Sequence, residues 1–166
     1  MKDKKLLYLT QGAMIATLYI VLTYLANAFG LANYAIQVRF SEALTVLPFF
    51  TPAAIPGLTI GCLLSNILTG CAMPDIIFGT LATLIGALAT YFISAALKRN
   101  TLALWLSPIP PIVANAAIIP IVLKYAYGIE PWWFSFITVT AGEIISCGIL
   151  GVLLLFALKP VAKKIF

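Results

Sequence analysis

Long apolar runs follow one another along the whole chain, with only a few polar residues between them, and this limits what the chain can fold into. Of its 166 residues, 63% are hydrophobic and 9% are charged. The mean hydropathy of +1.09 is well above what a water-soluble domain needs for its core. Because a helix needs about 20 apolar residues to cross a bilayer, the chain has room for about five to seven spans. We therefore expect an all-α polytopic membrane protein with a single membrane domain over residues 1–166.

Six apolar segments can be distinguished, and the second is too short to span a bilayer by itself. They cover residues 6–28, 42–51, 53–69, 75–97, 102–123 and 132–158. Pro48, Pro52 and Pro56 interrupt the second and third segments. Proline removes a helical donor and restricts the residue before it. This stretch therefore predicts either one broken helix or a tight hairpin of two short helices.

The positive charges favour the hairpin, because lysine and arginine in short loops prefer the cytoplasmic side of a membrane. With six segments, only Arg39 and Lys124 fall outside. The cytoplasmic side then holds Lys2, Lys4, Lys5, Lys98, Arg99, Lys159, Lys163 and Lys164. With five segments this bias is inverted. The sequence therefore predicts a bundle of six transmembrane helices with both termini in the cytoplasm.

The composition also argues against several classes of function. The positive residues occur in short clusters without aromatic interleaving, so we expect no nucleic-acid binding. Histidine is absent, and Cys62, Cys71 and Cys147 do not have the spacing of metal ligands, so we expect no metal and no cofactor. The sequence has no nucleotide-binding loop of the Gly-x-x-x-x-Gly-Lys type and no evident pair of nucleophile and base. We therefore expect no enzyme activity, and any ATP hydrolysis must come from a partner.

Four of the five acidic residues fall at or within the outer half of the predicted bundle. Glu42 and Asp75 open the second and fourth segments, Glu130 lies in the last outer loop, and Glu143 lies within the sixth segment. An ionisable group inside the bilayer is costly and usually faces a cavity or a partner. Glu143 lies ten residues past Trp133, about 15 Å along the helix. Of all residues in the chain, Glu143 therefore gives the most information about the position of a binding site.

Asparagine side chains accompany these acids. Asn115 lies nine residues before Lys124 on the antiparallel fifth segment, which places it at a depth of about 14 Å. Asn115 and Glu143 can therefore line one pocket. Asn66 and Asp75 lie nearer the outer surface. Together these residues predict an outward-facing cup whose floor lies in the middle of the membrane.

The predicted cup contains more negative than positive charge. It suits a cation or a heterocycle that is rich in donors, because carboxylates pair well with adjacent N–H groups. A planar ligand can also stack on aromatic side chains. The aromatic candidates are Phe40, Tyr127, Trp132 and Trp133, and Arg39 is the nearest positive candidate.

Most of these residues also have a structural alternative. A carboxylate that opens a helix, as Glu42 and Asp75 do, can cap free N–H groups there, and Arg39 can simply pair with Glu42. Tryptophans at a membrane boundary usually form an aromatic belt. Buried asparagines can link helices by hydrogen bonds. For Glu143 a functional role is favoured.

Small residues occur at helical spacing near the cytoplasmic end of the first segment. Gly12 and Ala16 are one turn apart, and such a pair lets another helix approach closely. For Gly12, Ala13 and Ala16 two interpretations remain open. One is packing within the bundle, and the other is contact with a separate membrane partner.

Five short motifs carry a resemblance to a known family. They are residues 39–45, Pro56 to Leu58 with Gly61 and Cys62, Asp75 to Gly79, Pro110 and Pro111 with Asn115, and Gly142 with Glu143. As a set, over nearly the whole chain, they resemble the queuosine precursor transporter family. Its members are substrate-binding S-components of energy-coupling factor (ECF) transporters.

The resemblance implies a six-helix subunit of the bacterial plasma membrane that binds a 7-deazaguanine outside the cell, such as 7-aminomethyl-7-deazaguanine or queuine. It implies an ECF module as partner, consisting of a shared transmembrane protein and two ATPases. On this interpretation Glu143 meets the donor edge of the base, and Asp75 or Glu42 meets the amine. Asn66 and Asn115 support them.

S-components typically carry an Ala-xxx-Ala motif on the first helix for docking. Here Ala13 is followed four residues later by Thr17, whereas Gly12 and Ala16 give the equivalent spacing. The resemblance therefore implies a docking surface on the first segment without fixing its register.

Two other functions remain as alternatives. One is an S-component for another vitamin or a cationic, nucleobase-like heterocycle. The other is a stand-alone membrane carrier or channel, for which a continuous path of polar residues is expected. Below Glu143 the sixth segment offers only Ser146 as a clearly polar residue, which predicts a cup that is closed at its floor.

Overall fold

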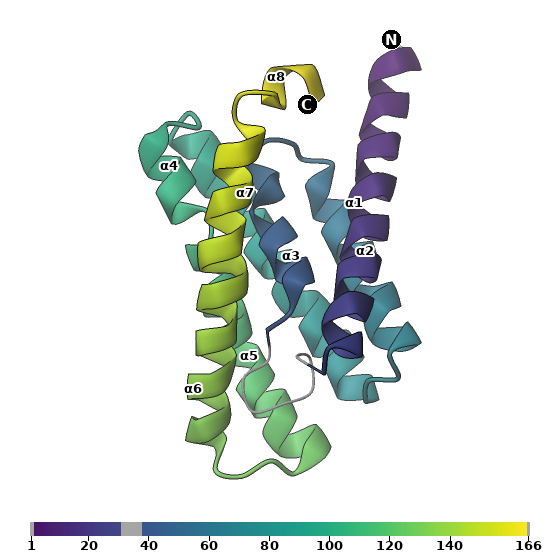
Figure 1. Ribbon diagram of the computed structural model, residues 1–166, viewed down its shortest axis with the longest axis vertical. Coiled ribbons are helices and arrows are strands. Elements are labelled where there is room, and N and C mark those ends of the chain that lie inside the picture. The colour runs from purple at the N-terminus through teal and green to yellow at the C-terminus, as the bar shows by residue number, and fades with distance from the viewer. Residues whose placement is uncertain (1, 31–37, 166) are drawn as a thin grey trace.

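A computed structural model describes residues 2–30 and 38–165, and all regular secondary structure in these residues is helical (Figure 1). The elements are α1 (Lys2–Ala28), the 3₁₀-helix η1 (Phe40–Phe49), α2 (Ala54–Leu68), α3 (Met73–Ala96), α4 (Thr101–Leu106), α5 (Ile109–Tyr127), α6 (Trp132–Glu143), the π-helix η2 (Ile144–Leu150), α7 (Gly151–Leu158) and α8 (Ala162–Ile165). The prediction of an all-α fold is confirmed.

Four helical stretches are long and apolar enough to cross a bilayer. They are Lys4–Ala28, Met73–Ala96, Thr101–Tyr127 and Trp132–Leu158. η1 and α2 are apolar but shorter, and at their respective rises per residue each covers only about 20 Å. The outer faces of the long helices expose large apolar side chains, which suits contact with lipid. The chain is a multi-pass membrane protein, while the count of six crossings and the cytoplasmic side of the termini stay predictions.

Hydrogen bonds between side chains show that η1 runs antiparallel to α1. Near the end of α1, Thr23 Oγ1 donates to Ser41 Oγ at 2.9 Å. Near the start of α1, Thr51 Oγ1 donates to Gln11 Oε1 at 3.0 Å. Successive residues of η1 therefore lie beside progressively earlier residues of α1.

The next helix, α2, turns back and runs parallel to α1. The two helices approach so closely that a Cβ atom added to Gly57 would lie 2.7 Å from the Gly12 carbonyl oxygen. One added to Gly61 would lie 2.8 Å from Tyr19 Cβ. The proline-rich stretch is thus a hairpin of two short helices, η1 and α2. Figure 1 shows both chain termini at the same end of the bundle.

Proline and glycine residues set the ends of the later helices. Pro74 lies in the first turn of α3 and Pro110 in the first turn of α5, where a missing N–H group costs little. α5 ends at Gly128, whose left-handed conformation (φ 67°) caps the helix. α3 and α5 pack closely, because a Cβ atom at Gly86 would lie only 2.7 Å from Pro111 Cα.

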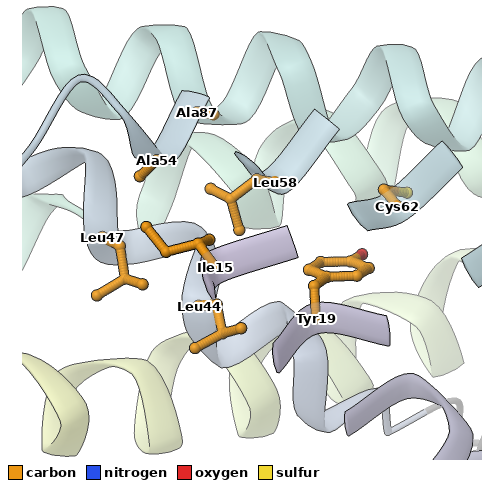
Figure 2. Packing of buried hydrophobic residues seen from close by; sticks show 8 residues of the cluster. All are labelled: Ile15, Tyr19, Leu44, Leu47, Ala54, Leu58, Cys62 and Ala87. Carbon is orange, nitrogen blue, oxygen red and sulfur yellow. The ribbon is translucent and has the colours of Figure 1, made fainter. Parts of the chain in front are cut away.

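Two clusters of apolar side chains pack in the half of the bundle that lies toward the termini. Figure 2 shows one cluster, made of Ile15, Tyr19, Leu44, Leu47, Ala54, Leu58, Cys62 and Ala87. A second cluster is made of Val46, Phe49, Ala103, Leu104, Cys147 and Leu155. η1 takes part in both, and its residues from Ser41 to Phe49 are all buried. These clusters pack between the termini and the site described next.

Candidate functional site

A small polar cavity, here called the central cavity, lies where η1, α3, α5 and α6 meet. Its walls are Arg39, Glu42, Gly79, Thr83, Asn115, Ile119, Val139 and Glu143. Glu143 lies about 17 Å from the start of α6 and about 22 Å from the end of α7, at 1.5 Å per residue. The cavity is therefore near the middle of the long helical stretch. Its free space is about 10 Å³, which is room for about one water molecule.

Irregular helices place both glutamates at the cavity. Glu42 lies in the first turn of η1, a 3₁₀-helix of ten residues, although such helices rarely exceed three or four residues. Glu143 is the last residue of α6, immediately before the π-helix η2. The two irregular helices are in contact, since Thr45 Oγ1 lies 3.1 Å from Cys147 Sγ. Departures from α-helical geometry of this kind are frequent at functional sites.

Three buried polar atoms around the central cavity lack hydrogen-bond partners. They are Glu42 Oε2, Asn115 Nδ2 and Glu143 Oε2. The three side chains are only 2%, 4% and 8% exposed. The Asn115 amide lies beside both carboxylates, but without the geometry of a good hydrogen bond. Because each unpaired buried group costs roughly 1–3 kcal/mol, their convergence from three elements makes the central cavity the candidate site, where water or a ligand supplies the partners.

The other oxygen of Glu42 is already engaged. Tyr19 of α1 donates its hydroxyl hydrogen to Glu42 Oε1. Thr45 Oγ1 donates to the Glu42 carbonyl oxygen at 2.6 Å, which holds the first turn of η1. The Glu42 carboxylate therefore presents one occupied and one free oxygen.

Asp75 and Asn66 lie behind Gly79 rather than in the cavity wall. A Cβ atom at Gly79 would lie 3.2 Å from Asn66 Nδ2 and 3.6 Å from Asp75 Oδ1. Asp75 Oδ2 accepts a hydrogen bond of 3.1 Å from the Tyr127 hydroxyl, while Asp75 Oδ1 is buried and unpaired. Asn66 Nδ2 donates to Cys62 Sγ at 3.6 Å. A side chain at position 79 would therefore come between this second polar layer and the cavity.

Arg39 is half-buried and lines the cavity just before η1 begins. Its guanidinium group is close enough to Asp75 and Glu42 for electrostatic attraction. Within residues 2–30 and 38–165, however, the one ion pair with an N–O distance within 4.0 Å joins Lys124 to Glu130, at 3.0 Å. The alternative in which Arg39 forms a direct ion pair with Glu42 is therefore not found.

The predicted stacking residues are not brought into the cavity. Trp132 and Trp133, in the first turn of α6, are 52% and 54% exposed, as an aromatic belt would be. Phe40 is half-buried at the start of η1 and does not line the cavity. The Tyr127 hydroxyl accepts from the Ala72 N–H group at 2.9 Å and donates to Asp75. The Tyr127 hydroxyl thus supports the second polar layer, and stacking of any of these rings on a ligand stays a prediction.

Sequence reasoning missed several residues of the site. Gly79 and Thr83 follow Asp75 at intervals of four residues, so one face of α3 carries all three, and this spacing was a usable signal. Tyr19 gave a weaker signal, as a tyrosine within an apolar run. Its partner Glu42 lies 23 residues away in the sequence, and only the fold brings the two together.

The small residues of α1 are divided between two faces. Gly12 is half-buried and Ala16 is buried, and both face α2, whereas Ala13 and Thr17 are exposed. A surface groove of about 410 Å³, here called the α1 groove, runs between α1 and α2. It is lined by Tyr8, Leu9, Gly12, Ala13, Ala16, Thr17, Ile20, Pro56, Gly57, Ile60 and Leu64. Gly12 and Ala16 pack against α2 and also line the groove, and Ala13 is its exposed small residue. Whether these three residues contact a separate partner stays a prediction.

Four apolar helices of membrane-spanning length and a mid-bundle cavity with unpaired carboxylate oxygens define a class of protein. They describe a multi-pass membrane protein with an internal site for a small polar molecule, as transport proteins have. The sequence profile of the family described as QueT transporter matches residues 9–160, and the chain belongs to this family.

A named relative supports the same assignment. The protein named Queuosine precursor transporter QueT, from Lactococcus lactis subsp. cremoris (strain MG1363), is 36% identical over 85 residues. The match covers 51% of this chain and 50% of the relative, so the chain spans about half the length of that relative. No solved structure matches the chain. The predicted resemblance to the queuosine precursor transporter family is confirmed.

Proposed function

We propose that this chain is the high-affinity, substrate-binding S-component of an ECF-type importer in the bacterial plasma membrane, and that its substrate is a 7-deazaguanine queuosine precursor. The observation that carries the proposal is the set of unpaired polar atoms at the site. Glu42 Oε2, Glu143 Oε2 and Asn115 Nδ2 face the central cavity, and Asp75 Oδ1 lies beside it. A ligand that satisfies them needs several donors, one acceptor and preferably a positive charge.

A 7-deazaguanine with an aminomethyl group has this combination. Its guanine-type edge presents two adjacent N–H donors beside a carbonyl acceptor. In this proposal Glu143 accepts from the donor edge, and Asn115 Nδ2 donates to the carbonyl oxygen. The protonated amine is attracted to Glu42 or Asp75, since unlike charges interact strongly away from water.

The central cavity has to expand when such a ligand binds. Its free space of about 10 Å³ compares with about 300–1,000 Å³ for typical ligand pockets. A two-ring molecule therefore requires the walls from η1, α3, α5 and α6 to move apart. The opening lowers the net affinity by its own free energy, and the new hydrogen bonds must exceed that cost.

Transport by this proposal needs a partner. Two apolar clusters pack on the side of Glu143 that lies toward the termini, and the buried polar groups among them, such as Ser94 and Ser146, are small hydroxyls. We place the contact with the ECF module on the α1 groove, where Ala13 and Thr17 are exposed. The module supplies the ATPases, and the chain itself binds substrate without catalysing a reaction.

Isothermal titration of the purified, detergent-solubilised protein tests the substrate. The ligands are 7-aminomethyl-7-deazaguanine and queuine, with guanine, riboflavin and thiamine as controls. Tight binding confined to the deazaguanines is the expected result. Saturation by another cationic heterocycle alone would retain an S-component and reject the substrate. Transport of the substrate by liposomes that contain only this chain would favour the stand-alone carrier.

A further inference from the structure

Tyr19 is the largest side chain among those that are fully buried in the described part of the chain. Figure 2 shows its ring at one end of the apolar cluster, on the side of Cys62. The ring has little freedom, because the side chain is only 1% exposed and packs in the apolar cluster. Its root is also held, since a Cβ atom at Gly61 of α2 would lie 2.8 Å from Tyr19 Cβ. The position of the hydroxyl group is therefore fixed by packing.

The fixed hydroxyl group determines how Glu42 faces the central cavity. It donates to Glu42 Oε1, which leaves Oε2 as the buried oxygen without a partner. A carboxylate that is oriented before the ligand arrives loses less conformational freedom on binding. Such an arrangement also limits Glu42 to one free acceptor oxygen.

The geometry points to Tyr19 as a positioning residue that holds Glu42 to receive the amine of the ligand, an inference that rests on the proposed function. One free oxygen suits a single charged donor group, whereas a two-donor edge needs two acceptor oxygens from one carboxylate. Asp75 is less suitable for the amine, because it lies behind Gly79 and one of its oxygens is held by Tyr127. Glu42 therefore recognises the substituent, and Glu143 recognises the base.

The test separates positioning from a general structural role by using two ligands. Both are 7-deazaguanines, one with an aminomethyl group and one with an uncharged cyano group at the same carbon. Dissociation constants are measured by titration for the full chain and for Tyr19→Phe, which keeps the ring and removes the hydroxyl group. Tyr24→Phe is the matched control, because Tyr24 lies on the same helix and donates to the Leu68 carbonyl oxygen away from the cavity.

We expect Tyr19→Phe to weaken binding of the aminomethyl ligand by roughly 10- to 100-fold, as for a lost hydrogen bond to a charged group. Binding of the cyano ligand should change by less than roughly threefold, since it makes no charged contact with Glu42. Tyr24→Phe should leave both constants unchanged. In a Glu42→Gln background, Tyr19→Phe should have no further effect on the aminomethyl ligand, because the two residues act as one unit.

Other results would overturn the inference. Equal weakening for both ligands, additive effects in the Glu42→Gln background, or no change on Tyr19→Phe would each reject a positioning role. If Tyr19→Phe does not fold, Glu42→Gln alone must still lose the preference for the aminomethyl over the cyano ligand. Failure of the unmodified chain to bind either deazaguanine would reject the proposed function, and the inference with it.

Discussion

Glu143 lies within a 27-residue helical stretch, Trp132–Leu158, where a carboxylate is costly unless a partner compensates it. Within the described residues its Oε2 atom makes no hydrogen bond; Arg39 and Asn115 lie near enough for favourable electrostatic interaction, but Asn115 Nδ2 is itself without a hydrogen-bond partner. Stability alone would favour an apolar side chain at this position. The retained carboxylate is therefore best explained by an interaction that forms only with the ligand.

Glu143→Gln should weaken 7-deazaguanine binding by about 2–5 kcal/mol, because an amide offers one acceptor oxygen without charge. Titration of the purified variant measures the loss. Glu130→Gln is the matched control, since Glu130 is exposed and pairs with Lys124 on the surface. The Glu130→Gln protein should bind the ligand with unchanged affinity. An unchanged dissociation constant in a folded Glu143→Gln protein would remove Glu143 from the site.

The backbone at Arg99 has a strained conformation, far from the site. Both Lys98 and Arg99, in the turn after α3, have φ angles of 51°, a left-handed conformation that costs a side-chain-bearing residue about 1 kcal/mol or more. Arg99→Gly should therefore raise the melting temperature relative to Arg99→Ala, which loses the same charge but keeps the strain. Thermal unfolding in detergent compares the two variants. An Arg99→Ala protein as stable as Arg99→Gly would show that the strain is absent.

At the scale of elements, the η1–α2 hairpin decides the architecture of the site. Its existence followed from charge and proline placement, and the predicted segments 42–51 and 53–69 agree closely with η1 and α2. The sequence did not indicate that η1 is a 3₁₀-helix or that residues after Glu143 form a π-helix. Hydrogen-bond patterns of this kind depend on contacts between distant segments, such as Thr45 with Cys147, and local residue preferences do not encode them.

Close packing of α3 against α5 holds two walls of the central cavity together. Gly86→Ala should destabilise the protein by about 1–3 kcal/mol, because the new methyl group would lie 2.7 Å from Pro111 Cα and force the helices apart. Gly148→Ala is the control, since a Cβ atom there meets only side-chain atoms at 3.8 Å. Denaturation of both variants in the same detergent measures the difference. Equal stability would mean that the α3–α5 contact is looser than described.

At the scale of the whole molecule, the buried carboxylates Glu42, Asp75 and Glu143 gather at and beside the central cavity. Depth counting along helices predicted that Glu143 and Asn115 share a pocket, and the structure brings both to the central cavity. It did not predict that the aromatic residues stay outside. The depth of a residue in the bundle follows from its position along its helix, which can be counted in the sequence. The direction in which Trp132 or Tyr127 faces depends instead on how each helix is rotated against its neighbours.

The two faces of α1 connect the site to the surface of the molecule. Tyr19 reaches Glu42 from one face of α1, and Ala13 is exposed in the α1 groove on another face. Ala13→Trp would fill the groove without touching the central cavity, so substrate affinity of the isolated protein should be unchanged. Uptake by cells that also contain the ECF module should fall by at least roughly tenfold, because a large side chain prevents close helix contact.

Met14→Trp provides the comparison for that experiment. Met14 is the next residue on α1 and is 60% exposed, but it does not line the α1 groove. A docking surface in the groove predicts normal uptake and normal co-purification of the ATPases with Met14→Trp, and loss of both with Ala13→Trp. If both variants transport normally, the module contacts another face of the bundle. If both variants bind substrate poorly, a large side chain on the exposed part of α1 disturbs the central cavity. The uptake measurement would then not report on docking alone.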